Sequence, residues 1–232
     1  MFLYSLLEVS KQATTIVWWI SIGAVVILFG LIALISIFYK KRRDARQLAF
    51  AGICIALSFI LAVLKFSLIP SGGSVTLASF VPIMLYAYVY GPIDGLMVGL
   101  IHGLLNFIED PYILNPATFL LDYLLAFASI AVIGFFNKTS SRKKAVKPLA
   151  IGCTCVYALR FLAHYLSGII FFLNNSVCVT LPAWATANAF IYSLIYQCIY
   201  IPLDFVISLS VLILLAKAGV VDKITKTVNA KG

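Results

Sequence analysis

Long apolar runs separated by short polar stretches make up most of this chain. Seven of them fall at roughly residues 16–39, 47–69, 75–90, 95–108, 116–136, 148–173 and 185–216. A helix needs about 20 apolar residues to cross the ~30 Å hydrocarbon core of a bilayer, and the alternating pattern of an outer-membrane barrel is absent. The pattern predicts an all-α integral membrane protein.

Two of these runs, 75–90 and 95–108, are shorter than a perpendicular span requires. They are joined by GPIDG, a sequence typical of a turn. In a membrane protein, interrupted segments are accommodated where the backbone meets protein or a polar cavity. We expect these two runs to lie beside a cavity rather than to face lipid.

Composition and charge agree with a membrane protein. Of 232 residues, 63% are hydrophobic and 11% are charged, and the mean hydropathy is +1.08, which excludes an ordinary soluble domain. The net charge of +9 does not indicate nucleic-acid binding, because the basic residues sit in short clusters between apolar runs.

These clusters predict the topology. Residues 40–46, 137–147 and 216–232 hold 14 of the 17 Lys and Arg residues, and basic residues next to a span stay in the cytoplasm. We expect the N-terminus outside the cell and the C-terminus in the cytoplasm. The chain then divides into an additional N-terminal helix with its basic linker (1–46), a six-helix membrane domain (47–216) and a basic cytoplasmic tail (217–232).

A few polar residues interrupt the predicted spans at one depth. Asp122 lies about two turns into its run, and His164 about two turns before the end of another, so both fall in the outer half of the membrane. Arg160 shares a helix face with His164, four residues away. An ionisable group within a span costs about 2.5–3.5 kcal/mol on insertion scales, so such residues generally have a partner or a function.

Aromatic and amide side chains in the last run fall at similar depth: Tyr192, Tyr196 and Gln197, with Trp184 at its entrance. Asp122 and Arg160 could form a structural ion pair, and the tyrosines an aromatic belt. Together, however, these residue types favour a pocket for a flat, polar, cationic small molecule, with Asp122 as its counter-charge. No repeated acidic ring indicates an ion channel, and no motif indicates a metal or a cofactor.

At these residues the chain resembles the substrate-binding S components of energy-coupling factor vitamin transporters, specifically the thiamine-binding family. The resemblance covers most of residues 47–216 and is carried by four stretches, IPSGGSVTLASFVPIMLYAYVYGPIDGLMVGLIHGLLNFI, PYILNPATFLLDYLLAF, LRFLAHYLSGIIFF and IYSLIYQ. It implies a six-helix bundle in a bacterial cell membrane that binds thiamine from outside.

The resemblance also implies roles for individual residues. Asp122 would answer the positively charged thiazolium ring, with Tyr123 beside it. The family's basic residue and histidine, four apart, match Arg160 and His164, and a family tyrosine matches Tyr192. A loop that closes over the ligand would contain three small residues, Gly72, Gly73 and Ser74.

The chain departs from the family pattern at three places. Gln197 stands where asparagine is usual, and Phe172 where some members have a stacking tryptophan. Trp184 lies in a loop unlike that of the family and is only a candidate replacement for that tryptophan. The helix expected at 16–39 is an addition to the six-helix pattern.

The resemblance implies partner proteins as well, a transmembrane coupling subunit and two cytoplasmic ATPase subunits. The chain has no Gly-rich loop ending in Lys-Ser or Lys-Thr, so the energy would come from those partners. Gly52 and Ala56 have the small-xxx-small spacing that lets a partner helix approach closely. Ordinary packing within the bundle would explain the same spacing.

Two other functions remain open from the sequence. An S component for another ring-containing vitamin or precursor is suggested by Gln197 and Phe172. An intramembrane enzyme would use His164 with Ser167 or Asp122, although no nucleophile elbow or His-Glu-x-x-His motif accompanies them. We therefore expect a protein that binds its ligand without changing it chemically.

Overall fold

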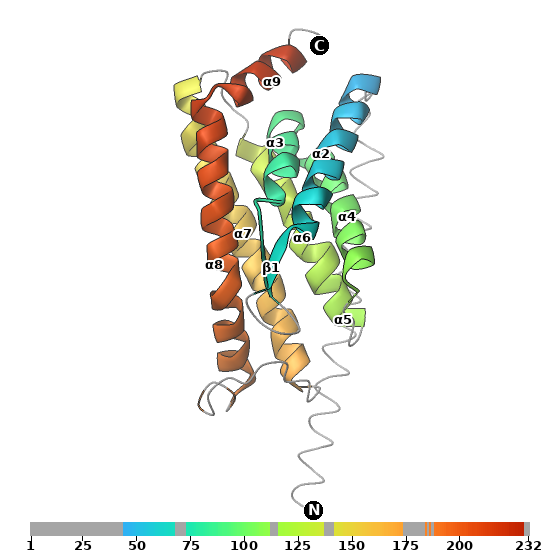
Figure 1. Ribbon diagram of the computed structural model, residues 1–232, viewed down its shortest axis with the longest axis vertical. Coiled ribbons are helices and arrows are strands. Elements are labelled where there is room, and N and C mark those ends of the chain that lie inside the picture. The colour runs from blue at the N-terminus through green and yellow to red at the C-terminus, as the bar shows by residue number, and fades with distance from the viewer. Residues whose placement is uncertain are drawn as a thin grey trace, which may run out of the picture.

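The computed structural model shows a bundle of helices running along one long axis (Figure 1). It describes residues 44–67, 73–111, 116–136, 142–173, 184, 186 and 188–229, with the backbone alone for 142–144 and 229. The additional helix expected at 16–39 lies outside the described residues.

Helices account for most of the described chain, so the all-α membrane class is confirmed. Within the described residues, four helical segments are long and apolar enough to cross a membrane. The elements in order are α2 (Ala45–Val63), β1 (Lys65–Ser67), β2 (Ser74–Thr76), α3 (Phe80–Tyr90), α4 (Pro92–Glu109), α5 (Pro116–Phe119), the π-helix η1 (Leu120–Leu125), α6 (Ala126–Ala128), the 3₁₀-helix η2 (Ser129–Phe136), α7 (Arg142–Leu173), α8 (Ala189–Lys217) and α9 (Val220–Asn229).

A short antiparallel hairpin replaces the ends of two predicted helices. β1 pairs with β2, with Lys65 opposite Thr76 and Ser67 opposite Ser74. The run expected at 47–69 therefore ends as a helix at Val63, and the one expected at 75–90 starts only at Phe80. The apolar content of these short stretches did not distinguish a helix from a strand, because apolar residues are typical of buried segments of either kind.

Helix α3 is short because it lies inside the protein. It packs against α2, α4 and η2, and ten of its eleven residues are buried. At about 1.5 Å per residue it is far too short to cross a bilayer. A helix that is apolar on all sides suits this position, since it meets protein in every direction.

Helix α4 approaches the segment 116–136 very closely through two glycines. A Cβ atom on Gly103 would lie 2.1 Å from the carbonyl oxygen of Tyr123, and one on Gly99 would lie 2.5 Å from that of Phe127. Only glycine allows this contact between the two backbones. The approach fixes α4 against η1, the π-helix that carries Asp122 and Tyr123.

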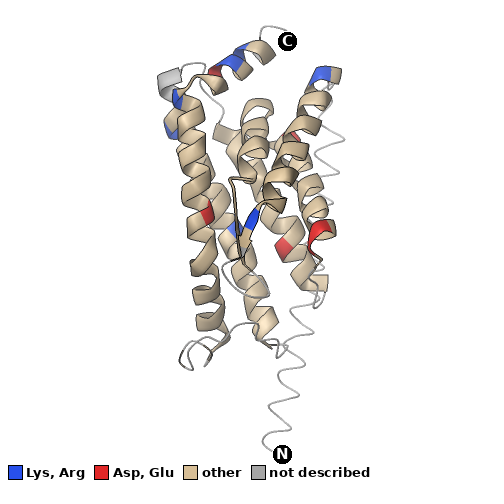
Figure 2. Ribbon diagram, in the orientation of Figure 1, with Lys and Arg blue, Asp and Glu red and all other residues tan. Residues whose placement is uncertain are grey.

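Of the Lys and Arg residues coloured in Figure 2, most gather at the end of the molecule where α2 begins and α9 lies. Helix α9, which the sequence pattern did not predict within the tail, packs against α3, α7 and α8. Its buried residues include Val221 and Thr225. The tail therefore caps the basic end of the bundle.

Replacing Gly103 by Ala should lower the free energy of unfolding by about 1–3 kcal/mol, because the added methyl group overlaps a backbone carbonyl that cannot move away easily. Thermal unfolding of the detergent-solubilised protein would measure this. The matched control is Gly52→Ala, where the new Cβ meets nothing within 4 Å and the gain in helix propensity favours a small stabilisation. Equal shifts in the two variants would contradict the close approach of α4 and η1.

Candidate ligand-binding site

A cavity of about 380 Å³ opens between α4, η1, α7 and α8, with the β hairpin against it. This volume lies within the usual range for small-molecule sites, roughly 300–1,000 Å³. Of the predicted site residues, those that line it are Gly73, Ser74, Asp122, Tyr123, Arg160, His164, Tyr192, Tyr196 and Gln197. The sequence thus identified residues from four separate elements that the fold brings together.

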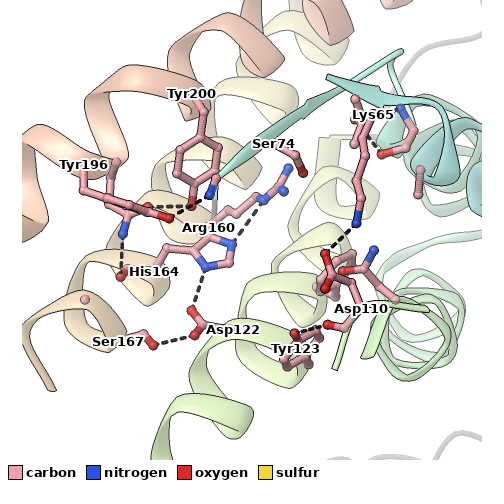
Figure 3. Close-up of a pocket in the computed structure, with 18 of the residues that line it drawn as sticks. Lys65, Ser74, Asp110, Asp122, Tyr123, Arg160, His164, Ser167, Tyr196 and Tyr200 are labelled. Atoms are coloured by element: carbon pink, nitrogen blue, oxygen red, sulfur yellow. Dashed lines mark hydrogen bonds and ion pairs between the residues drawn. The ribbon is translucent and has the colours of Figure 1, made fainter. Parts of the chain in front are cut away.

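Asp122 is held at the cavity wall by two side chains of α7. Its Oδ1 lies 2.7 Å from Nδ1 of His164, and its Oδ2 accepts a hydrogen bond of 2.5 Å from the hydroxyl of Ser167 (Figure 3). The side chain of Asp122 is 28% exposed, so part of the carboxylate remains accessible. Its position on a π-helix is consistent with a functional role, since π-helical turns are rare and occur frequently at functional sites.

Arg160 does not pair with Asp122, so the ion pair considered from the sequence is wrong. Its Nη1 lies 2.7 Å from Oδ2 of Asp204, on α8, and its guanidinium stacks over the ring of Phe80, 4.2 Å from the ring centre. Asp204 is 1% exposed. Asp204 supplies the counter-charge of Arg160, and the Asp122 carboxylate has no Lys or Arg partner among the described residues.

Asp204 was missed in the sequence, although its setting resembles that of Asp122. In YIPLDFVISL it is a single acid within an apolar run, which is itself a signal of function or of a partner. Besides Arg160, its carboxylate accepts hydrogen bonds from the backbone N–H and hydroxyl of Thr76, at 3.2 and 2.8 Å, and from Tyr157, at 3.0 Å. Asp204 therefore joins β2, α7 and α8.

The same guanidinium orients His164. Arg160 donates through Nε to Nε2 of His164 at 3.4 Å, which makes Nε2 the acceptor nitrogen of the ring. The proton then resides on Nδ1 and is donated to Asp122. Two carboxylates, an arginine and a histidine thus form one hydrogen-bonded chain from the interior of the bundle to the cavity.

The hairpin is attached to α8 beside the cavity. The backbone N–H of Gly73 donates to the hydroxyl of Tyr196 at 2.7 Å. A Cβ on Gly73 would lie 2.2 Å from the ring of Tyr200, so this position requires glycine. Gly73 and Ser74 therefore meet the cavity as the family resemblance implied, whereas Gly72 lies outside the described residues.

One edge of the cavity carries a charged cluster of Lys65, Glu109 and Asp110. The ammonium of Lys65 lies 2.6 Å from Asp110 (Figure 3). It also lies 3.1 Å from Glu109. Partial burial acts to lower the pKa of Lys65, but the hydrogen bonds and negative charges of Asp110 and Glu109 outweigh it and raise that pKa above its usual value. Tyr123 donates to the carbonyl oxygen of Asp110 at 2.6 Å.

Gln197 uses its amide to connect two helices. Its Nε2 donates to the carbonyl oxygen of His164 at 3.0 Å, and its Oε1 accepts from Tyr200 at 2.6 Å. Phe172 lies behind Tyr192, with ring centres 5.2 Å apart, and does not line the cavity. Trp184 is 66% exposed and does not line it either, so the structure places neither candidate stacking residue at the site.

The charges around the cavity favour a cation. Among the described residues, Asp110 and Asp122 line the cavity, and Glu109 and Asp204 lie next to its lining. The two basic side chains of the lining, Lys65 and Arg160, are each already engaged in ion pairs with these carboxylates. Aromatic walls from Tyr192 and Tyr196 add faces that attract cations. The site suits a small aromatic molecule that carries a positive charge.

Asp204→Asn should lower the free energy of unfolding by about 3–5 kcal/mol, because it leaves the buried guanidinium of Arg160 without a counter-charge. The double variant Arg160→Met with Asp204→Asn should recover part of this loss. Asp110→Asn is the control, because its side chain is 65% exposed and such surface pairs contribute about 0–1 kcal/mol. Thermal unfolding would decide the matter, and a double variant no more stable than Asp204→Asn would contradict the pairing.

Comparison with known proteins supports the resemblance noted in the sequence. The model of the thiamine transporter protein family matches residues 48–222. A thiamine transporter of Bacillus subtilis, ThiT, is 37% identical over 155 residues, which cover 63% of this chain and 76% of that protein. A solved structure of ThiT from Listeria monocytogenes has the same fold, with a TM-score of 0.64 and 24% identity over 74% of this chain and 93% of that one. The chain therefore belongs to the thiamine transporter protein family.

Proposed function

We propose that this protein is the thiamine-binding S component of an energy-coupling factor importer and takes up thiamine from outside the cell. The observation that supports this most directly is Asp122, a partly accessible carboxylate at the wall of a cavity of suitable size. Thiamine carries a permanently charged thiazolium ring, for which such a carboxylate is the natural partner. The names of the family and of the relative from Bacillus subtilis point to the same ligand.

In this proposal, the site recognises charge and aromatic shape together. Asp122 provides the counter-charge, while His164 and Ser167 hold its carboxylate in place. Tyr192 and Tyr196 give aromatic surface on the opposite helix, on which a flat ring can stack. The main role of Arg160 is to orient His164 rather than to contact the ligand.

The position of the cavity supports uptake from outside. On α7 the lining residues extend from Arg160 to Phe171, and on α8 from Tyr192 to Tyr200. These are the halves of both helices that lie away from the basic end of the bundle (Figure 2). Since the basic end is expected in the cytoplasm, the cavity belongs to the outer half of the membrane, with the C-terminus inside.

The energy for transport would come from a transmembrane coupling subunit and two cytoplasmic ATPase subunits. Gly52 and Ala56 lie on the exposed face of α2, together with Ala45 and Ala49, and a Cβ on Gly52 would meet no atom within 4 Å. The stripe therefore faces away from the bundle, which supports helix docking at this surface rather than packing inside the protein.

The intramembrane enzyme finds less support in the geometry. Ser167 donates to Asp122, and His164 contacts the same carboxylate, whereas a nucleophilic serine needs the histidine itself as its base. The family is one of transporters. An S component for another ring-containing vitamin differs from the proposal only in the ligand and is tested with it.

Asp122→Asn should weaken thiamine binding by roughly tenfold to a hundredfold, as expected for losing a charged partner in a partly buried site. Isothermal titration calorimetry of the purified protein without ATP would measure this. Asp222→Asn, on α9 and distant from the cavity lining, is the matched control and should bind as wild type does.

A panel of other vitamins and thiamine precursors, used as competitors in the same titration, separates the two ligand hypotheses. Thiamine should displace every other compound. Absence of heat with thiamine, together with tight binding of another vitamin, would show that the ligand assignment is wrong while the S-component architecture remains.

Gly52→Leu should reduce thiamine uptake by cells that contain the whole transporter and leave the thiamine affinity of the isolated protein unchanged. The larger side chain would hold the partner helix away from α2, far from the cavity. The control is Ile53→Leu at the neighbouring exposed position, where the side chain keeps its volume because leucine and isoleucine are isomers. Normal uptake by the Gly52→Leu variant would contradict docking at this stripe.

A further inference from the structure

The other histidine of the chain, His102, has a chemical environment that no feature described so far explains. It lies on α4 with 0% of its surface exposed, and neither ring nitrogen has a hydrogen-bond partner among the described residues. The same residue belongs to the wall of the cavity. It is therefore a buried polar group adjacent to the site.

The position of His102 is fixed closely by its neighbours. Gly99 and Gly103, three residues before it and one after, are the glycines that bring α4 against the backbone of segment 116–136. The imidazole lies edge-on to Phe80 and Phe127, with ring centres 6.3 and 5.3 Å away, and both phenylalanines also line the cavity. The ring is thus held in an aromatic wall.

Nothing in the packing of this wall requires a polar ring. More than nine in ten buried polar groups in proteins have a hydrogen-bond partner, because burial without one is costly. A phenylalanine would fill the same space between two other phenylalanines without that cost. The imidazole is therefore explained best by a partner that comes from the cavity.

We propose that His102 binds the ligand directly and recognises an uncharged group that donates and accepts hydrogen bonds. An uncharged imidazole has one nitrogen of each kind, so it matches a hydroxyl group or the edge of an aminopyrimidine. Thiamine has both groups in addition to its charged ring. This inference rests on the proposed function and adds a second point of recognition, on a different helix from Asp122.

The test compares His102→Phe with Tyr88→Phe. Tyr88 lies on α3 with 0% exposure, its hydroxyl also lacks a partner among the described residues, and it does not line the cavity. Without ligand, both variants should unfold at the wild-type temperature or above it, since each loses an unsatisfied polar group. In calorimetry, His102→Phe should bind thiamine about tenfold more weakly, and Tyr88→Phe as wild type does.

Two thiamine analogues identify the group. One has an ethyl group in place of the hydroxyethyl, and the other a phenyl ring in place of the aminopyrimidine. A difference between wild type and His102→Phe that disappears with one analogue supports the proposal and shows which group His102 recognises. A difference that persists with both would overturn it, because His102 would then act through packing.

Two further results have distinct meanings. Thiamine binding by His102→Phe equal to that of wild type would overturn the role of His102 alone. Absence of thiamine binding by wild type would overturn the proposed function and this inference together.

Discussion

The buried ion pair between Arg160 and Asp204 is the interaction on which the rest of the site depends. A charge removed from water is costly, and the pair persists because each member is surrounded by suitable groups. Thr76 and Tyr157 donate to the carboxylate, and the ring of Phe80 lies under the guanidinium. One consequence is structural, since the pair joins α7, α8 and the hairpin. The other is chemical, since Arg160 pairs with Asp204 and the Asp122 carboxylate keeps no Lys or Arg partner among the described residues.

Close packing around glycine complements this polar network. Gly99 and Gly103 let α4 meet the backbone that carries Asp122 and Tyr123, and Gly73 lets the hairpin meet Tyr200. The separation of α4 from segment 116–136 is therefore set by contacts with backbone atoms, whereas the hairpin meets the ring of Tyr200. Such contacts are rigid, which suits a site that has to orient a small flat molecule with few groups.

The sequence predicted the membrane class, most of the helices and much of the site, because depth within an apolar run and spacing along a helix are properties of the chain itself. Asp122 and His164 were placed at one depth, and they do meet. Contacts between helices were less predictable, since spacing shows which residues share a face but not which faces meet. Arg160 was considered as a partner of Asp122, while Asp204 went unnoticed on the last helix. The two candidate stacking residues, Phe172 and Trp184, do not line the cavity, and the β hairpin has too few residues for a periodicity to appear.

The π-helix at Leu120–Leu125 has a consequence for how this segment tolerates change. A π turn holds one more residue than an α turn, so it amounts to a single-residue insertion retained within a helix. Asp122 and Tyr123 lie within that wider turn, and both reach the cavity although they are adjacent in sequence. Removing one residue from the turn would return the segment to regular α-helix with both flanks near their present register, and would take away the wide turn that lets two adjacent residues reach the cavity. Variation among related chains should therefore consist of substitutions in this segment, with its length kept constant.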